Sequence, residues 1–134
     1  MTTKTYQGSC HCKRVRYQVD LDLAKGTGRC NCTLCTKLRA WSANVKPDAF
    51  KLLSGEDALS TYSKSEYMQY RFCRHCGVQA FGTGNIPELG GAFVSVKLGG
   101  LDDVEPAELI AAPIRFFNGR NNRWMETPAE TRHL

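Results

Sequence analysis

The seven cysteines of this 134-residue chain fall into three closely spaced groups. The groups are Cys10-x-Cys12, Cys30-x-Cys32-x-x-Cys35 and Cys73-x-x-Cys76. Cysteines so close in sequence do not easily form disulfides with each other, but their thiolates bind a metal ion well. Zinc takes four protein ligands in a structural site, and three plus an open position in a catalytic site. Because seven is four plus three, the count favours two zinc ions of different kinds.

The cysteine count and the start of the chain both favour metal sites over disulfides. A disulfide framework would leave one of seven thiols over. The first six residues lack the apolar stretch of a signal peptide, and the sequence has no apolar run of membrane-spanning length. We therefore expect a cytoplasmic protein without a membrane partner. In that compartment thiols stay reduced, and cysteine clusters bind metals.

The net charge of +5 and the isoelectric point of about 8.9 make the chain moderately basic. There is no dense basic run, so we expect no nucleic-acid partner. The basic residues nearest the cysteines form either a solvated surface or a positive rim that attracts a small anionic substrate. They are Arg29, Lys37, Arg39, Arg71 and Arg74.

Strand patterns dominate the segments that must position these cysteines. Val15, Tyr17 and Val19 alternate with polar residues and predict a strand over residues 13–20. Helix signals are weak: residues 32–37 and 47–50 fit one turn each, and residues 102–110 have few apolar positions and contain Pro106. The sequence therefore predicts a single all-β domain over residues 1–134. Other strand-like segments are residues 38–45, 50–53, 59–62, 67–72, 78–81, 92–98 (a buried-looking strand) and 114–117.

A metal is expected to be part of such a loop-rich fold. Ordering each residue costs about 1–2 kcal/mol, whereas a structural zinc site contributes about 10–16 kcal/mol to folding. The segment Cys73–Gly77 has the spacing of a zinc knuckle, which supplies two of four ligands.

Two partners for this knuckle are open on spacing alone. Cys32 with Cys35 would complete a zinc ribbon, but would leave the other three cysteines without a role. Cys10 with Cys12 would join the start of the chain to its middle, and would leave Cys30, Cys32 and Cys35 as a local three-ligand set. We favour the second arrangement because it uses all seven cysteines.

The three motifs Gly8–Cys12, Cys30–Cys35 and Phe72–Gly77 resemble those of the glutathione-dependent formaldehyde-activating enzyme (GFA) family, in the superfamily of centromere protein V. The resemblance runs from about Tyr6 to Trp124. It implies a tent-like all-β fold (Mss-like β-tent) of short antiparallel sheets stapled by zinc. It also implies a structural zinc on Cys10, Cys12, Cys73 and Cys76, and a second zinc, where substrate binds, on the catalytic residues Cys30, Cys32 and Cys35. One departure is Lys13, where members often carry Gly.

A zinc centre with three thiolate ligands has a formal charge of −1, which weakens it as a Lewis acid toward water. Its open position suits a soft sulfur ligand and holds a thiol as the nucleophilic thiolate. We therefore predict a zinc-dependent carbon–sulfur lyase that joins a thiol to a carbonyl such as formaldehyde, or reverses that addition. This agrees with the activity that the resemblance implies, the formation of S-(hydroxymethyl)glutathione, with glutathione or a related small thiol as substrate.

The remaining side chains near the motifs suggest further roles. Glutathione carries two carboxylates, which suit bidentate guanidinium partners, and the candidate anchors are Arg29, Arg39, Arg120 and Arg123. Trp41 and Trp124 are candidate walls of the site, although we expect Trp41 to pack in the core. Asn31 and Thr33 lie between cysteines of the second group, and we expect them to hydrogen bond the sulfurs. His11 and His75 are expected to point away from the metal into solvent.

Two other functions compete with the lyase. A non-enzymatic, zinc-stabilised binding module would need a fourth protein ligand to close the three-cysteine set. A thiol redox enzyme would use Cys32-x-x-Cys35, but that motif should lie between a strand and a helix in a βαβ pattern, which the sequence lacks.

Overall fold

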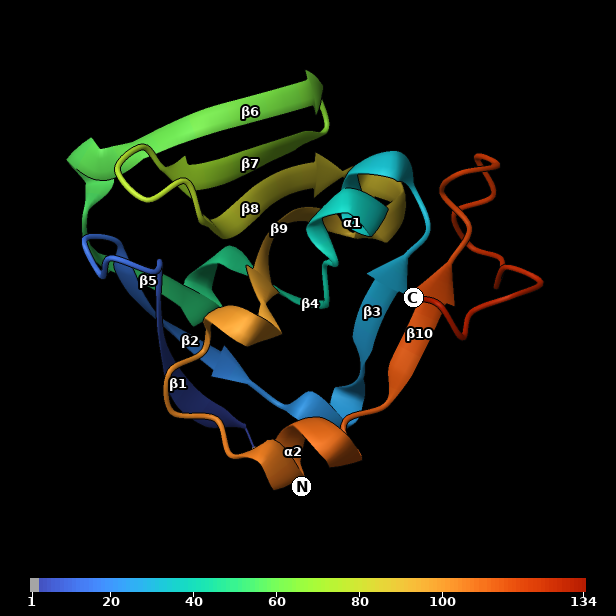
Figure 1. Cartoon of the computed structure of the whole chain (residues 1–134), viewed down its shortest axis with the longest axis horizontal. Helices are drawn as coiled ribbons and strands as arrows, with labels where there is room; N and C mark the ends of the chain where they lie inside the picture. The colour runs from blue at the N-terminus through green and yellow to red at the C-terminus, as the bar shows by residue number, and fades with distance from the viewer. Residues whose placement is uncertain (1–2) are drawn as a thin grey trace.

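The computed structural model describes residues 3–134, and its strands form two sheets (Figure 1). The three-stranded sheet has the order β1-β2-β5 and is antiparallel, with β1 at Lys4–Ser9, β2 at Arg16–Leu21 and β5 at Phe50–Ser54. The seven-stranded sheet has the order β10-β3-β4-β9-β8-β7-β6. Its strands are β3 (Thr27–Cys30), β4 (Ser42–Val45), β6 (Leu59–Ser65), β7 (Met68–Cys73), β8 (Gln79–Ile86), β9 (Gly91–Lys97) and β10 (Ile114–Phe117).

Short helices connect the strands. The α-helices are α1 at Thr33–Leu38 and α2 at Pro106–Ala111. The 3₁₀ turns are η1 (Leu23–Lys25), η2 (Pro47–Ala49), η3 (Glu56–Ala58), η4 (Pro87–Leu89) and η5 (Leu98–Gly100). No helix within residues 3–134 is long and apolar enough to span a membrane.

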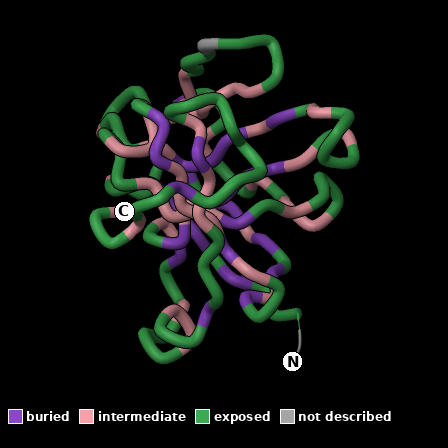
Figure 2. The backbone as a smooth tube through the Cα atoms, turned by 90° about the vertical axis from the view of Figure 1, so that its right-hand side faces the viewer, coloured by how far each residue is buried: buried purple, intermediate pink, exposed green. Residues whose placement is uncertain are grey.

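The core lies where the two sheets face each other, and Figure 2 shows the buried stretches of chain gathered in the interior. Tyr17 of β2 stacks on Phe50 of β5 with ring centroids 5.1 Å apart. Phe50 in turn meets Phe81 of β8 at 4.6 Å, so an aromatic cluster joins the sheets. Fully burying such a side chain contributes about 1.5–3 kcal/mol, which makes this contact a main source of sheet-to-sheet adhesion.

Strand alternation gives the seven-stranded sheet two different faces. Along β9, Val94 and Val96 are buried in the core cluster. Phe93, Ser95 and Lys97 point the other way and line a cavity. One face therefore packs the core, and the opposite face is free to hold a ligand.

The expectation of a mostly β protein is confirmed, with local differences. The strand predicted over residues 13–20 is β2, which begins at Arg16. It begins later because the chain from Cys10 to Val15 forms a tight loop, in which the Cys10 N–H donates to the Val15 carbonyl at 3.1 Å. The segment 38–45 is a strand only from Ser42, because α1 runs to Leu38. The strand pair β3–β10 is parallel, so the larger sheet is mixed rather than purely antiparallel.

Two strands and one α-helix were not predicted. Strands β1 and β3 were missed, and Pro106 begins a helix instead of preventing one. Proline suits the first position of a helix, where its missing N–H needs no partner. A reciprocal capping box between Glu105 and Glu108 then satisfies the remaining donors of the first turn.

Candidate metal centres and the adjoining cavity

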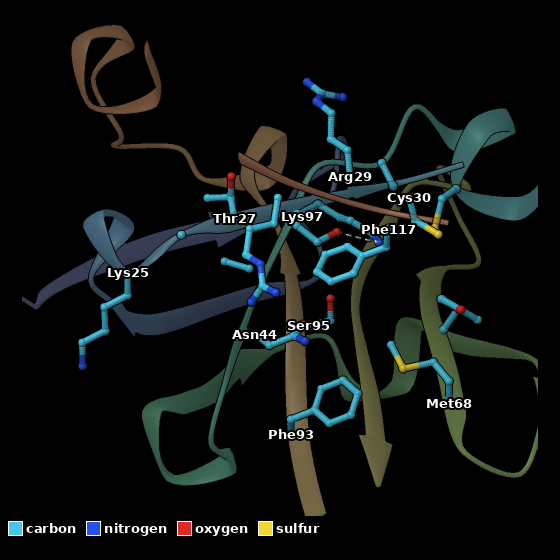
Figure 3. A pocket seen from close by; sticks show the side chains of 18 residues that line it. Lys25, Thr27, Arg29, Cys30, Asn44, Met68, Phe93, Ser95, Lys97 and Phe117 are labelled. Carbon is cyan, nitrogen blue, oxygen red and sulfur yellow. Dashed lines mark hydrogen bonds between the residues drawn. The ribbon is translucent and has the colours of Figure 1, made fainter. Parts of the chain in front are cut away.

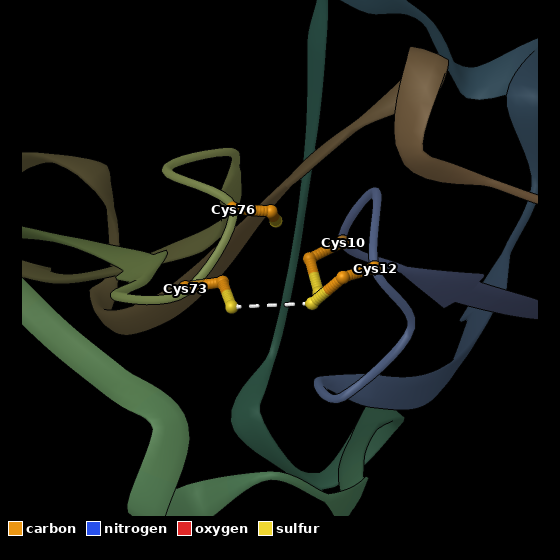
Figure 4. Close-up of side chains that lie close together, drawn as sticks. All are labelled: Cys10, Cys12, Cys73 and Cys76. Atoms are coloured by element: carbon orange, nitrogen blue, oxygen red, sulfur yellow. Dashed lines mark hydrogen bonds between the residues drawn. The ribbon is translucent and has the colours of Figure 1, made fainter.

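The structure brings Cys10, Cys12, Cys73 and Cys76 together into one group, the four-cysteine cluster (Figure 4). The first two come from the turn between β1 and β2, Cys73 is the last residue of β7, and Cys76 lies in the turn between β7 and β8. All four Sγ atoms lie within 4.8 Å of one another, and the Sγ of Cys12 is 3.7 Å from those of Cys10 and Cys73. Sulfurs placed about 2.3 Å from a tetrahedral zinc lie about 3.8 Å apart, so this group fits that ion.

Local backbone geometry presents these sulfurs. Lys13 adopts a φ of 66°, in the left-handed region that favours glycine, which explains the turn at this position. Backbone amides of Val15 and His75 donate to the Sγ atoms of Cys10 and Cys73, each at 3.4 Å. The amide of Arg14, and then its side chain, lower the pKa of Cys12 to about 6, which favours the thiolate that a metal needs.

The four-cysteine cluster connects the two sheets. Cys10 and Cys73 are buried; Cys10 directly follows β1 of the smaller sheet, and Cys73 ends β7 of the larger sheet. His11 and His75 are exposed and lie outside the cluster. The structure thus groups the knuckle with the first cysteine pair, and does not form a ribbon with Cys32 and Cys35.

Cys30, Cys32 and Cys35 form a second group, the three-cysteine cluster, whose Sγ atoms also lie within 4.8 Å of one another. Cys30 ends β3, Cys32 is the N-cap of α1, and Cys35 lies in the first turn of that helix. The amide of Cys32 donates to Cys30 Sγ, and that of Cys35 donates to Cys32 Sγ, both at 3.4 Å. The turn into α1 therefore gathers the sulfurs on one side of the chain.

Hydrogen bonds among the thiols of this cluster raise the pKa of two of them. Hydrogen bonding to Cys32 raises the pKa of Cys30, and hydrogen bonding to Cys30 and then Cys32 raises the pKa of Cys35. A metal ion that binds here must displace these protons. Among residues 3–134, no histidine, cysteine or carboxylate side chain joins the three cysteines as a fourth ligand.

Asn31 does not hydrogen bond the sulfurs, contrary to expectation. Its buried amide group donates to Asn118 Oδ1 at 3.0 Å and accepts from the backbone N–H of Arg120 at 2.9 Å. Asn31 therefore ties the three-cysteine loop to the loop that follows β10. Backbone amides bind the sulfurs instead, and Thr33 is exposed at the start of α1.

A cavity of about 360 Å³ opens on the free face of the seven-stranded sheet and reaches Cys30 and Cys35 (Figure 3). Its apolar wall includes Met68, Phe93 and Phe117. Glycines of β8 make room for this wall, because a Cβ at Gly84 would collide with the Phe93 ring and lie 3.0 Å from the sulfur of Met68. The cavity thus has one apolar wall and reaches the three-cysteine cluster.

The lining of the cavity is basic. Four of its residues are Lys25, Arg29, Lys97 and Arg115, and no aspartate or glutamate of the described part of the chain lines it. Burial lowers the pKa of Arg29, and the nearby charge of Arg39 lowers it further. Such an excess of cations over anions attracts an anionic ligand.

Of the four predicted arginine anchors, only Arg29 lines the cavity. Arg39 donates to the backbone oxygen of His133 at 2.9 Å, and Arg120 donates to that of Asn31 at 3.0 Å. Arg123 pairs with Glu126 at 3.7 Å on the surface.

The other three basic residues of the lining were not among the predicted anchors. For Lys97 a signal was present: in residues 92–98, Phe93, Ser95 and Lys97 alternate with valines, which marks a two-sided strand rather than a fully buried one.

The two tryptophans occupy different positions. Trp41 packs against the core, donates from Nε1 to Thr27 Oγ1 at 2.7 Å, and carries the Arg29 guanidinium 4.9 Å above its ring. Trp124 is half exposed beside Gly119, where an added Cβ would collide with its ring and lie 2.8 Å from Cys30 Sγ. Trp124 therefore lies near Cys30 of the three-cysteine cluster but is not among the residues that line the cavity.

Comparison with known proteins shows the family of the chain and a protein that shares its fold. The family model described as "Glutathione-dependent formaldehyde-activating enzyme" matches residues 5–119, so the chain belongs to the GFA family. A crystal structure of a Rhodobacter sphaeroides protein superposes with a TM-score of 0.66 at 24% sequence identity. The match covers 81% of this chain and 99% of that one, and it shows a shared fold.

Proposed function

We propose that this protein is a single-domain, zinc-dependent carbon–sulfur lyase that forms or exchanges S-(hydroxymethyl)glutathione or a related thiol adduct. In this proposal the four-cysteine cluster holds a structural zinc, and the three-cysteine cluster holds a second, catalytic zinc. The observation that carries the proposal is that the three-cysteine cluster adjoins a basic cavity and that, within residues 3–134, no fourth histidine, cysteine or carboxylate ligand closes it.

The three-cysteine cluster suits thiol chemistry. A zinc ion bound by Cys30, Cys32 and Cys35 would offer an open position to a thiol and favour its deprotonated form. The apolar wall of the cavity, formed by Met68, Phe93 and Phe117, excludes part of the solvent. Electrostatic interactions are stronger where water is excluded. The thiols of the cluster must be reduced to bind metal, and we therefore place the protein in the cytoplasm.

The cavity fits a substrate of the size and charge of glutathione. A volume of about 360 Å³ lies in the range of small-molecule sites. Glutathione has two carboxylates and one ammonium group at neutral pH, so its net charge is opposite to that of the cavity lining. Lys25 and Arg115 are exposed at the cavity, and we assign them to the substrate carboxylates.

The test is an exchange NMR experiment on a mixture of glutathione and formaldehyde. The protein is first shown by metal analysis to hold two zinc ions per chain. We expect it to raise the exchange rate between free and adduct-bound formaldehyde above the rate in buffer. Cys35→Ser, which removes one ligand of the three-cysteine cluster, should abolish this effect. If the two-zinc protein leaves the buffer rate unchanged, the lyase proposal is wrong.

A further inference from the structure

Lys97 places a positive charge inside the cavity without an acidic partner. The residue ends β9 and is half-buried, and its Nζ donates to Ser42 Oγ at 3.3 Å, the bond drawn in Figure 3. No carboxylate in the described part of the chain forms an ion pair with it. Because burying an uncompensated cation costs free energy, this position favours an anionic group in the cavity.

Strand pairing places Lys97 near the strand that ends at the three-cysteine cluster. Strand pairing sets Lys97 opposite Ser42, and Ser42 opposite Gly28, two residues before Cys30. Lys97 also lines the same cavity as Cys30 and Cys35. Burial there lowers the pKa of its ammonium group.

The other cations of the lining are placed differently. Lys25 and Arg115 are exposed. Figure 3 shows the Arg29 guanidinium turned away from the cavity interior. The guanidinium lies over the ring of Trp41. Lys97 is thus the cation of the lining that points into the cavity next to the cluster without another partner for its charge.

We infer that Lys97 is a catalytic residue of the reaction, in which its ammonium group hydrogen bonds and then protonates the oxygen that becomes the adduct hydroxyl. This inference rests on the proposed lyase function. The reacting oxygen is bonded to the carbon that the thiol sulfur attacks, so it lies about one atom beyond the sulfur held at the three-cysteine cluster. A charged donor in the same cavity as Cys30 and Cys35 can stabilise the negative charge that develops on this oxygen.

The step balances without an oxidant or reductant. The thiolate sulfur donates an electron pair to the carbonyl carbon, and a carbon–sulfur bond forms. The π pair of the carbonyl moves to oxygen, which takes a proton from the Lys97 ammonium. The proton released when the thiol ionises returns to Lys97 through solvent. In the reverse direction neutral Lys97 accepts the hydroxyl proton, and the carbon–sulfur bond breaks.

The test compares Lys97→Met with Lys25→Met, which removes the same charge from the exposed part of the lining. Exchange NMR gives kcat and KM for each variant, metal analysis gives the zinc content, and calorimetry gives glutathione affinity. A general acid contributes about 10²–10⁴-fold. We expect Lys97→Met to lower kcat about 100-fold or more with two zinc ions and glutathione affinity retained. Lys97→Arg, which keeps the charge, should recover part of kcat.

Lys25→Met serves as the control and should raise KM several-fold with little change in kcat. The inference is overturned if Lys97→Met keeps kcat within about threefold of wild type, or if its loss of kcat follows a loss of zinc or of glutathione affinity. If Lys97→Met fails to fold, Lys97→Arg and Lys97→Gln decide: equal kcat values for these two also overturn it. A wild-type protein without activity refutes the proposed function itself, which separates that failure from failure of the Lys97 inference alone.

Discussion

Replacing Asn31 by alanine removes the side chain that ties the three-cysteine cluster to the loop after β10. The change deletes one bond donated to Asn118 Oδ1 and one accepted from the backbone of Arg120. Each such bond contributes about 0.5–1.5 kcal/mol net. Because Asn118 Oδ1 still accepts from Asn121 at 3.0 Å, it is not left unpaired. We therefore expect a loss of about 1–3 kcal/mol in the free energy of unfolding.

The assay is urea unfolding of the zinc-loaded protein, followed by the fluorescence of its two tryptophans. Asn121→Ala is a matched control, because Asn121 donates to the same Asn118 oxygen but is exposed. Its loss should cost less than about 1 kcal/mol. Asn31→Ala should also release zinc from the three-cysteine cluster to a chelator faster than Asn121→Ala does. Equal stability and equal zinc release in the two variants would refute the assigned role of Asn31.

Two further predictions concern local packing and charge. Hydrogen bonding, first from Lys4, lowers the pKa of Glu108 from 4.5 to about 2, so its stabilising effect is complete above pH 4.5 and is lost as pH falls toward 2. The stability difference between wild type and Glu108→Gln, measured by urea unfolding, should therefore narrow from pH 5 to pH 3, and a constant difference would contradict this. Gly119→Ala should destabilise the fold by about 1–3 kcal/mol and shift Trp124 fluorescence, because the new Cβ collides with that ring. At Gly99 an added Cβ would have no atom of the described residues within 4 Å, apart from those of its two chain neighbours. Gly99→Ala should therefore change neither quantity, and an equal effect at both sites would contradict the packing argument.

The division of the cysteines could be predicted from their number, whereas their spacing alone left two partners for the knuckle open. Seven cysteines in three groups allow a four-plus-three division that uses every thiol, and the structure brings together those two sets. The mostly β character was also predictable, because Val15, Tyr17 and Val19 alternate at the period of a strand and are all buried.

Other features depend on tertiary contacts that a local pattern does not contain. Strand β3 has the sequence Thr-Gly-Arg-Cys, without a run of apolar side chains, and it forms because β4 and β10 pair with it. Strand β1 has Tyr6 as its single large apolar residue and depends on its pairing with β2. The partners of Asn31 lie 87 and 89 residues away, so its structural role could not be seen from its neighbours in sequence.

The central claim is that the four-cysteine cluster holds a structural zinc and the three-cysteine cluster a catalytic one. Counting zinc in two single-cysteine variants tests this claim most directly. A structural zinc contributes about 10–16 kcal/mol, comparable to the whole net stability of about 5–15 kcal/mol of a typical protein. We therefore predict that Cys73→Ser unfolds, whereas Cys32→Ser stays folded and binds one zinc per chain instead of two. A Cys32→Ser protein that unfolds like Cys73→Ser, or that keeps two zinc ions, would contradict the account.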